Sequence, residues 1–127
     1  MNTLDICMFL MGKGEFIIKI LVVDDQETMR KVISHILRQL GFEDIKSAAD
    51  AKLAFRMLKQ NNFDLVISDW YMPGMTGLQL LKAIRQTESI KETPVLLVTS
   101  DSKKEHVIEA VKAGVNNYIS KPFSGAE

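Results

Sequence analysis

Short, nearly continuous apolar runs alternate with segments of helical periodicity along this chain, and this alternation restricts its fold more than any other feature. Residues 16–23, 65–68 and 95–98 form three such runs. Runs of this length without polar alternation are typical of strands buried on both faces of a parallel sheet. Residues 29–40 instead place apolar side chains every three or four positions, which predicts a helix that Gly41 ends as its C-terminal cap.

The other elements follow the same alternation. Residues 45–48 and 118–119 predict two more short strands. Each of the three remaining helices starts after a residue that caps helices well. These helices, with their caps, are 53–58 with Asp50, 78–84 with Thr76, and 107–111 with Asp101 or Ser102. Five strands alternating with helices predict an α/β fold with a parallel sheet, in which ligands bind beyond the carboxyl ends of the strands.

The composition favours a single small domain. The chain has 127 residues, of which 46% are hydrophobic, and its 16 basic and 16 acidic residues leave a formal net charge of zero. General binders of nucleic acid or of membrane surfaces usually carry a basic excess, so neither partner is expected. Cys7 is the only cysteine, which excludes an intramolecular disulfide and fits the reducing cytoplasm.

Residues 1–15 are predicted to be an N-terminal extension of a domain that spans residues 16–127. Residues 6–11 are all apolar, but this run is too short to span a bilayer and lacks the basic leader of a signal peptide. We therefore expect no insertion into a membrane. Two explanations stay open: Met11 is the start of a shorter protein, or residues 4–11 form an apolar element that packs on the domain.

Carboxylates stand at the ends of two predicted strands. Asp24 and Asp25 follow the first strand, and Asp69 follows the third. Because the carboxyl ends of parallel strands meet at one edge, these three groups should converge, and their repulsion calls for a hard cation such as Mg²⁺. Thr99 and Lys121 end the fourth and fifth strands. The sequence therefore predicts a site that accepts a phosphoryl group.

Each of these residues, taken singly, has an ordinary structural explanation. Asp25 could be only a helix N-cap, and Asp69, which stands before a Pro-Gly turn, could be only a turn residue. Thr99 is a common type of strand residue, and a lysine such as Lys121 is usually a solvated charge. Their coincidence at four strand ends favours a functional site over four separate explanations.

Four segments, in order along the chain, resemble the receiver domain of two-component response regulators. These segments are residues 22–25, 68–73, 98–99 and 120–123. Within that family, residues 28–30 and 103–105 are most similar to the CheY type of chemotaxis regulator. The resemblance implies that residues 16–127 are a receiver domain with a flavodoxin-like, doubly wound five-stranded sheet in the order 2-1-3-4-5, of which CheY is a known example.

The resemblance also implies roles for the acidic residues. Asp69 would be the nucleophile that takes a phosphoryl group from a phosphohistidine on a partner kinase or from a small phosphodonor. Asp25 and Asp69 would bind Mg²⁺ directly, and Asp24 would act mainly through water. The backbone carbonyl of Tyr71 would supply a further ligand.

A second set of residues would stabilise the phosphoryl group and transmit its presence. Lys121 would neutralise one phosphoryl oxygen, and Thr99 would donate a hydrogen bond to another. Tyr118 would change its position as Thr99 moves, so that the face made by the fourth helix and fifth strand changes its affinity for a partner. Without the resemblance, Tyr118 is an ordinary half-buried strand residue. His35 and His106 lack metal-ligand spacing, and we expect no role for them.

The function implied is a signalling switch, not an enzyme. It would receive its phosphoryl group from a histidine kinase and bind a flagellar motor-switch protein or another output protein. Only four residues follow Phe123, so the family's fifth helix, which would share a face of the sheet with the helix at 29–40, is expected to be missing. Residues 4–11, or a second copy of the chain in a homodimer, would then cover that face.

Three alternatives remain at this point. The chain could be a receiver segment cut from a larger regulator or hybrid kinase. It could be a magnesium-dependent phosphohydrolase with an aspartate nucleophile, although such enzymes usually carry an Asp-x-Asp motif after the first strand. A flavin-binding module would need a Ser/Thr/Gly-rich phosphate loop there, whereas residues 24–27 are mostly acidic and would repel a phosphate.

Overall fold

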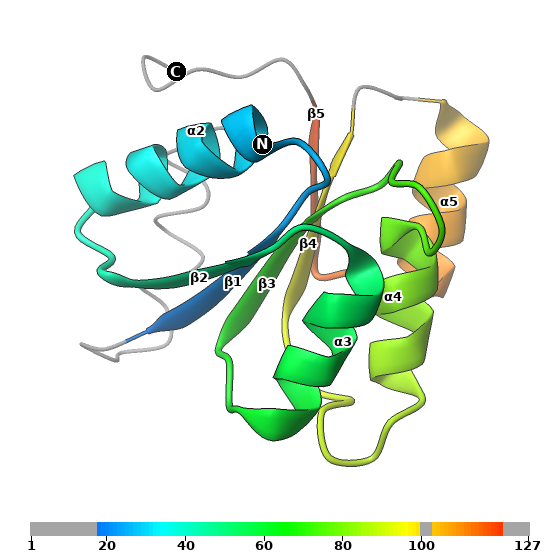
Figure 1. Cartoon of the computed structure of the whole chain (residues 1–127). Coiled ribbons are helices and arrows are strands. Elements are labelled where there is room, and N and C mark those ends of the chain that lie inside the picture. Colours follow the sequence, from blue (N-terminus) through cyan, green and yellow to red (C-terminus); the bar gives the residue numbers. More distant parts are fainter. Residues whose placement is uncertain (1–17, 100–102, 121–127) are drawn as a thin grey trace.

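Strands and helices alternate through the part of the chain that the structure, a computed structural model, describes, which is residues 18–99 and 103–120. The elements are β1 (Lys19–Val23), α2 (Glu27–Gln39), β2 (Asp44–Ala48), α3 (Ala51–Gln60), β3 (Leu65–Asp69), α4 (Gly77–Arg85), β4 (Val95–Thr99), α5 (Lys104–Lys112) and β5 (Asn117–Ser120). Figure 1 shows one sheet with α2 on one face and α3, α4 and α5 on the other. The predicted α/β fold is confirmed.

The five strands form one parallel sheet in the order β2-β1-β3-β4-β5, as the family resemblance implied. In the register of β1 with β3, Val23 pairs with Ser68. In the register of β3 with β4, Asp69 pairs with Val98. The carboxyl ends of all strands therefore meet at the upper edge of the sheet in Figure 1, and the residue after β1 lies beside the last residue of β3.

The strands are buried on both faces because alternate side chains point to opposite sides. One core layer packs under α3, α4 and α5, and its strand residues are Leu21, Val23, Ala48, Val66, Val95 and Leu97. The other packs under α2, and its strand residues are Ile20, Val22, Leu65, Ile67, Leu96, Val98 and Ile119. Burying each side chain of this size stabilises the fold by about 1.5–3 kcal/mol. The apolar runs of the sequence are thus explained by two cores on one sheet.

Two of the predicted helix caps are confirmed. The Asp50 side chain accepts a hydrogen bond from the N–H of Leu53 at 2.8 Å. Thr76 forms a reciprocal capping box with Gln79, in which each side chain accepts from the other's backbone N–H, at 3.1 and 2.9 Å. These bonds satisfy N–H groups that a helix start otherwise leaves unpaired.

The other two helix starts have N-caps that the sequence did not indicate. The N-cap of α2 is Gln26, whose own side chain makes no capping bond, so the ordinary explanation of Asp25 as only an N-cap does not hold. The Asp24 carboxylate instead accepts from the Gln26 N–H at 2.9 Å, which takes over the local role expected of Asp25. The N-cap of α5 is Lys103, and the predicted caps 101–102 lie outside the described residues.

Helix α5 is the least embedded of the four described helices. Its only buried residue is Ala110, whereas α4 buries five residues. Ile108 and Val111 on α5 are 43% and 64% exposed. None of the helices described between residues 18 and 120 is long and apolar enough to cross a bilayer.

Several expectations fall outside the described residues. These are the role of residues 4–11, the extension at 1–15, the helix expected to be missing after β5 and the homodimer that would replace it. They stay predictions, as do the boundaries of the domain.

Arg85, at the C-terminal end of α4, fastens three segments at the lower edge of the sheet. Its guanidinium donates to the carbonyl of Gly114 at 3.0 Å, to those of Lys91 and Thr93 at 3.1 and 2.6 Å, and to Asn116 Oδ1 at 2.7 Å. One side chain thereby holds α4, the segment that leads into β4 and the segment that leads into β5. The sequence pattern gave no sign of this role.

Candidate metal and phosphorylation site

Three carboxylates converge at the carboxyl edge of the sheet, as the sequence predicts. Asp24, Asp25 and Asp69 each place one oxygen so that all three atoms lie within 4.8 Å of one another. Asp24 and Asp69 are 1% and 9% exposed, and Asp25 is exposed. Two oxygens on opposite sides of one Mg²⁺ stand about 4.2 Å apart, so small side-chain shifts would fit this cluster around a divalent cation.

The backbone fixes Asp24 from both sides. Its N–H donates to the Ala48 carbonyl at 3.2 Å, and its own carbonyl accepts from the Arg30 guanidinium at 2.8 Å. The bond from the Gln26 N–H to its carboxylate orients the side chain. Arg30, to which the sequence analysis gave no role at the site, places a positive charge close to the acidic cluster.

Asp69 is held by the residues around the end of β3. The neighbouring Trp70 donates its N–H to Val98 at 3.0 Å, and its carbonyl accepts from the Gly77 N–H at 2.8 Å. A Cβ atom on Gly77 would collide with the backbone carbonyl of Asp69. Only glycine lets α4 start this close to the strand, so the position of Asp69 is set by backbone contacts.

Gly77→Ala tests this packing. We expect a loss of about 1–3 kcal/mol in the free energy of unfolding, because the added methyl has only backbone to displace. Phosphorylation should slow as well, since the displaced carbonyl belongs to Asp69. Urea denaturation and the rate of modification by acetyl phosphate measure the two effects. A variant as stable and as reactive as the wild type would show that the strand end can shift freely.

Thr99 lies on the strand next to that of Asp69, Tyr118 lies one strand further away, and Lys121 lies outside the described residues. Thr99 ends β4, the strand next to β3, and is 1% exposed. Tyr118 is half-buried on β5, and its ring meets Trp70 edge-on with centroids 6.3 Å apart. The structure therefore places Thr99 where the sequence predicts it and connects Tyr118 to the residue after Asp69.

The two aromatic residues after Asp69 behave differently from each other. From the sequence alone, Trp70 and Tyr71 are two aromatic residues with polar tips next to the site, and both could serve as partner contacts or as a partial lid. Trp70 is instead 5% exposed and belongs to the core under α3, α4 and α5. Tyr71 is 49% exposed, and its hydroxyl lies 3.4 Å from Nδ1 of His106 on α5. His106, for which the sequence predicts no role, thus contacts the loop that follows the phosphoacceptor candidate.

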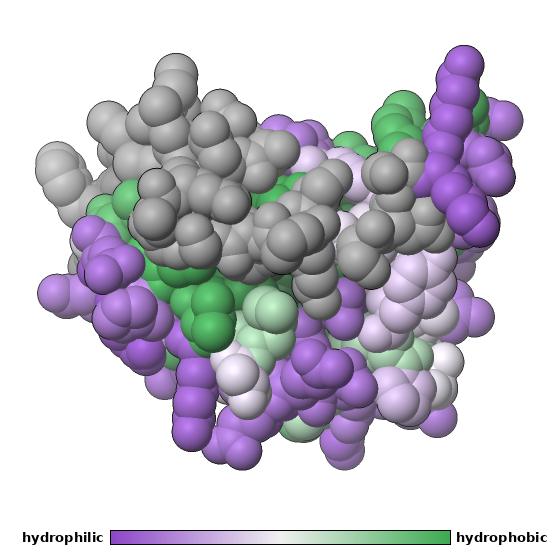
Figure 2. Space-filling view, turned by 90° about the horizontal axis from the view of Figure 1, so that it is seen from above, coloured by the Kyte–Doolittle hydropathy of each residue, from purple (hydrophilic) through white to green (hydrophobic). Residues whose placement is uncertain are grey.

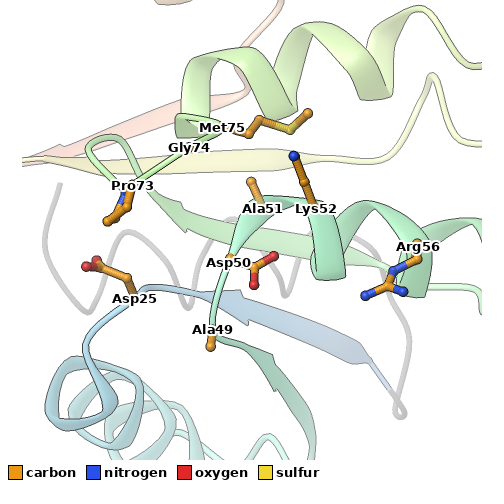
Figure 3. A pocket seen from close by; sticks show the side chains of 9 residues that line it. All are labelled: Asp25, Ala49, Asp50, Ala51, Lys52, Arg56, Pro73, Gly74 and Met75. Atoms are coloured by element: carbon orange, nitrogen blue, oxygen red, sulfur yellow. The ribbon is translucent and has the colours of Figure 1, made fainter.

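An open cavity of about 520 Å³ lies beside the acidic cluster. It is lined by Asp25, Ala49, Asp50, Ala51, Lys52, Arg56, Pro73, Gly74 and Met75. Figure 3 shows the Asp25 carboxylate directed toward Pro73, with Lys52 and Arg56 on the neighbouring helix. Figure 2 views the molecule from above this edge, and many of the hydrophilic side chains that it shows lie at the periphery. The described part of this edge is therefore accessible next to Asp25.

Comparison with known proteins decides the family. The model of the response regulator receiver domain matches residues 20–127. The chain belongs to this family. Receiver domains are the switches of two-component signalling, which confirms the predicted class of function and favours it over the phosphohydrolase and flavin-module alternatives.

Individual relatives agree with this assignment. The chain is 52% identical to chemotaxis protein CheY-3 of Vibrio cholerae over 108 residues, which is 85% of this chain and 83% of that protein. It is 51% identical to chemotaxis protein CheY of Pseudomonas aeruginosa over 106 residues, 84% of this chain and 86% of that one. The predicted resemblance to CheY is therefore confirmed.

Solved structures show the same fold. CheY4 of Vibrio cholerae superposes with a TM-score of 0.80 at 35% identity, covering 87% of this chain and 91% of that one. The receiver domain of a Pseudomonas aeruginosa sensor histidine kinase superposes with a TM-score of 0.76 at 28% identity, covering 87% and 89%. That receiver domain holds a magnesium ion in its active-site cleft.

Proposed function

We propose that this receiver domain is a chemotaxis switch that accepts a phosphoryl group on Asp69 from a histidine kinase and thereby changes its affinity for an output protein. The convergence of three carboxylate oxygens within 4.8 Å at the carboxyl edge carries the proposal. The similarity to chemotaxis proteins of two bacteria supports the pathway. The protein is a phosphoacceptor in the cytoplasm that assists its own phosphorylation and dephosphorylation, not an enzyme with a released substrate.

In the transfer, a carboxylate oxygen of Asp69 bonds to phosphorus as the bond from phosphorus to the histidine nitrogen of the donor breaks. Bound Mg²⁺ would neutralise charge on the phosphoryl oxygens. The residues that would hold it are Asp24, Asp25, Asp69 and the backbone carbonyl of Tyr71. Because Asp24 and Asp69 are largely buried, their charges interact more strongly than exposed charges would, which favours a divalent ion between them.

The signal would leave the site through Thr99, Lys121 and Tyr118. Thr99 would donate its hydroxyl to one phosphoryl oxygen, and Lys121 would pair with another. Movement of Thr99 would open space for Tyr118, whose ring already touches Trp70. The two arrangements form a two-state equilibrium that phosphorylation shifts.

The output partner would dock on α5 and β5. Helix α5 exposes Ile108 and Val111, and apolar side chains on the surface of a helix are typical of partner contacts. A flagellar motor-switch protein is the partner that the chemotaxis assignment favours. A histidine kinase is the phosphodonor, and neither nucleic acid nor a membrane is expected as a partner.

Binding of the motor-switch protein from the same organism tests the proposal. Beryllofluoride with Mg²⁺, which mimics the phosphorylated state, should raise the affinity of the wild type. Lys121→Ala should still bind beryllofluoride or accept a phosphoryl group to some extent, but should show little gain in partner affinity, because the charge contact that moves the loop is lost. Thr99→Ala should show the same effect more mildly. Fluorescence anisotropy of the labelled partner measures the affinities.

Lys46→Ala is the matched control, since Lys46 is exposed on the edge strand β2 at the other end of the sheet. It should behave like the wild type. Equal gains in affinity for all four proteins would contradict the proposed relay. No gain in the wild type would contradict the choice of partner.

A further inference from the structure

We propose that His106 is a positioning residue that ties the first turn of α5 to the metal-binding loop after Asp69, so that the placement of α5 and the affinity of the site for Mg²⁺ change together. This inference rests on the proposed function, because it uses the Tyr71 carbonyl as a metal ligand. His106 has no role in the transfer itself. It acts through Tyr71 and Trp70.

The contacts of His106 reach both residues that follow Asp69. Its Nδ1 lies 3.4 Å from the Tyr71 hydroxyl. Its ring lies 5.8 Å from the Trp70 ring between centroids, at an angle of 35°. The Trp70 and Tyr71 rings are themselves 6.1 Å apart. These distances make one aromatic cluster from α5 to the chain segment beside the phosphoacceptor candidate.

The members of this cluster differ in how firmly they are held. Trp70 is buried, and both its N–H and its carbonyl are bonded to neighbouring segments. Tyr71 has a half-exposed side chain, and the contact with His106 is one restraint on the direction that this side chain takes. The Tyr71 carbonyl belongs to the same residue. Fixing the side chain toward α5 therefore narrows the orientations open to a carbonyl that must meet the metal ion.

The coupling must act in both directions. A ligand that changes the affinity of a second site is itself affected to the same degree by binding at that site. Helix α5 buries only Ala110 and can shift at low cost, so a shift of its first turn would carry His106 away from Tyr71. A partner seated on α5 would then alter Mg²⁺ affinity, and Mg²⁺ would steady α5.

Calorimetric titration of the full chain with Mg²⁺ tests the proposal. Tyr71→Phe removes only the hydroxyl, and His106→Ala removes only the ring. Each should weaken Mg²⁺ binding by about two- to tenfold, the range of a single net hydrogen bond. The double variant should be no weaker than the worse single one, because both changes break the same contact. His106→Asn should recover most of the affinity, since its side-chain amide places a polar atom where Nδ1 stands.

A second measurement separates the proposed coupling from a purely structural role of His106. It is the effect of Mg²⁺ on hydrogen exchange of the amides in the first turn of α5, which a purely structural role would not change. Mg²⁺ should slow this exchange in the wild type and in the control Val111→Ala, which alters an exposed α5 residue. Mg²⁺ should not slow the exchange of these amides in His106→Ala.

Two results overturn the proposal. One is that both single variants bind Mg²⁺ as tightly as the wild type does. The other is that the loss of binding free energy in the double variant equals the sum of the losses in the two single variants. Absence of Mg²⁺ binding in the wild type would instead overturn the metal site itself and the proposed function with it.

Discussion

Asp69→Asn should abolish phosphoryl transfer to the protein while leaving the fold intact. An amide has nearly the shape of a carboxylate but is a poor nucleophile, so no acyl phosphate can form. The change also removes one of three converging negative charges. Without Mg²⁺, the variant should therefore be as stable as the wild type or more stable, because like charges in a partly buried cluster repel one another.

Intact-protein mass spectrometry after incubation with acetyl phosphate measures this effect. The wild type should gain one phosphoryl group with Mg²⁺ and none with a chelator. Asp50→Asn makes the same chemical change beside the site but outside the carboxylate cluster, and asparagine caps helices as well as aspartate does. This control should be modified like the wild type. A phosphoryl group that still appears on Asp69→Asn would assign the acceptor to another residue.

Arg85→Lys should cause the largest loss of stability among these changes, about 3–5 kcal/mol of a total of roughly 5–15 kcal/mol. One ammonium group cannot reach the four acceptors of the guanidinium, and each bond to a charged group contributes about 1.5–3 kcal/mol. Burial lowers the pKa of Arg85, an effect that Glu92 partly opposes. Arginine stays protonated under this pressure more readily than lysine does.

Thermal and urea unfolding measure that loss. Lys82→Ala is the control on the same helix, where the 3.8 Å ion pair with Glu109 is half-exposed and should contribute no more than about 1 kcal/mol. Asp69 lies at the opposite edge of the sheet. At temperatures where Arg85→Lys is folded, it should therefore still accept a phosphoryl group. If Arg85→Lys costs no more than Lys82→Ala, the four bonds do not fasten the lower edge.

The sequence predicted the parts of this protein that depend on local pattern. Apolar runs that alternate with helical spacing were enough for the strands, and polar residues at their ends were enough to place Asp24 and Asp69 at the same edge of a parallel sheet. The strand order came from the family resemblance. Thr76 was recognisable as a cap because threonine caps helices well and stands directly before a stretch of helical spacing.

Contacts between distant segments were not predictable in this way. Arg85 bonds to Gly114 and Asn116, and the His106 ring meets Tyr71, over separations that no short pattern records. The burial of Trp70 depends on three helices that pack on one face of the sheet. These contacts and the burial of Trp70 depend on the tertiary structure, which brings side chains from distant parts of the sequence together.

Because α5 buries little of its surface, it should tolerate substitutions that the strands would not. Asp24, Asp25 and Asp69 stand at the ends of strands that are packed on both faces, and a substitution inside such a strand disturbs a buried core. Substitutions at positions of α5 other than Ala110 disturb little of the core, because Ala110 is the only buried residue of this helix. Evolution could therefore replace one output partner by another through substitutions on the exposed side of this helix, while the phosphoryl-transfer chemistry at the sheet edge stays the same.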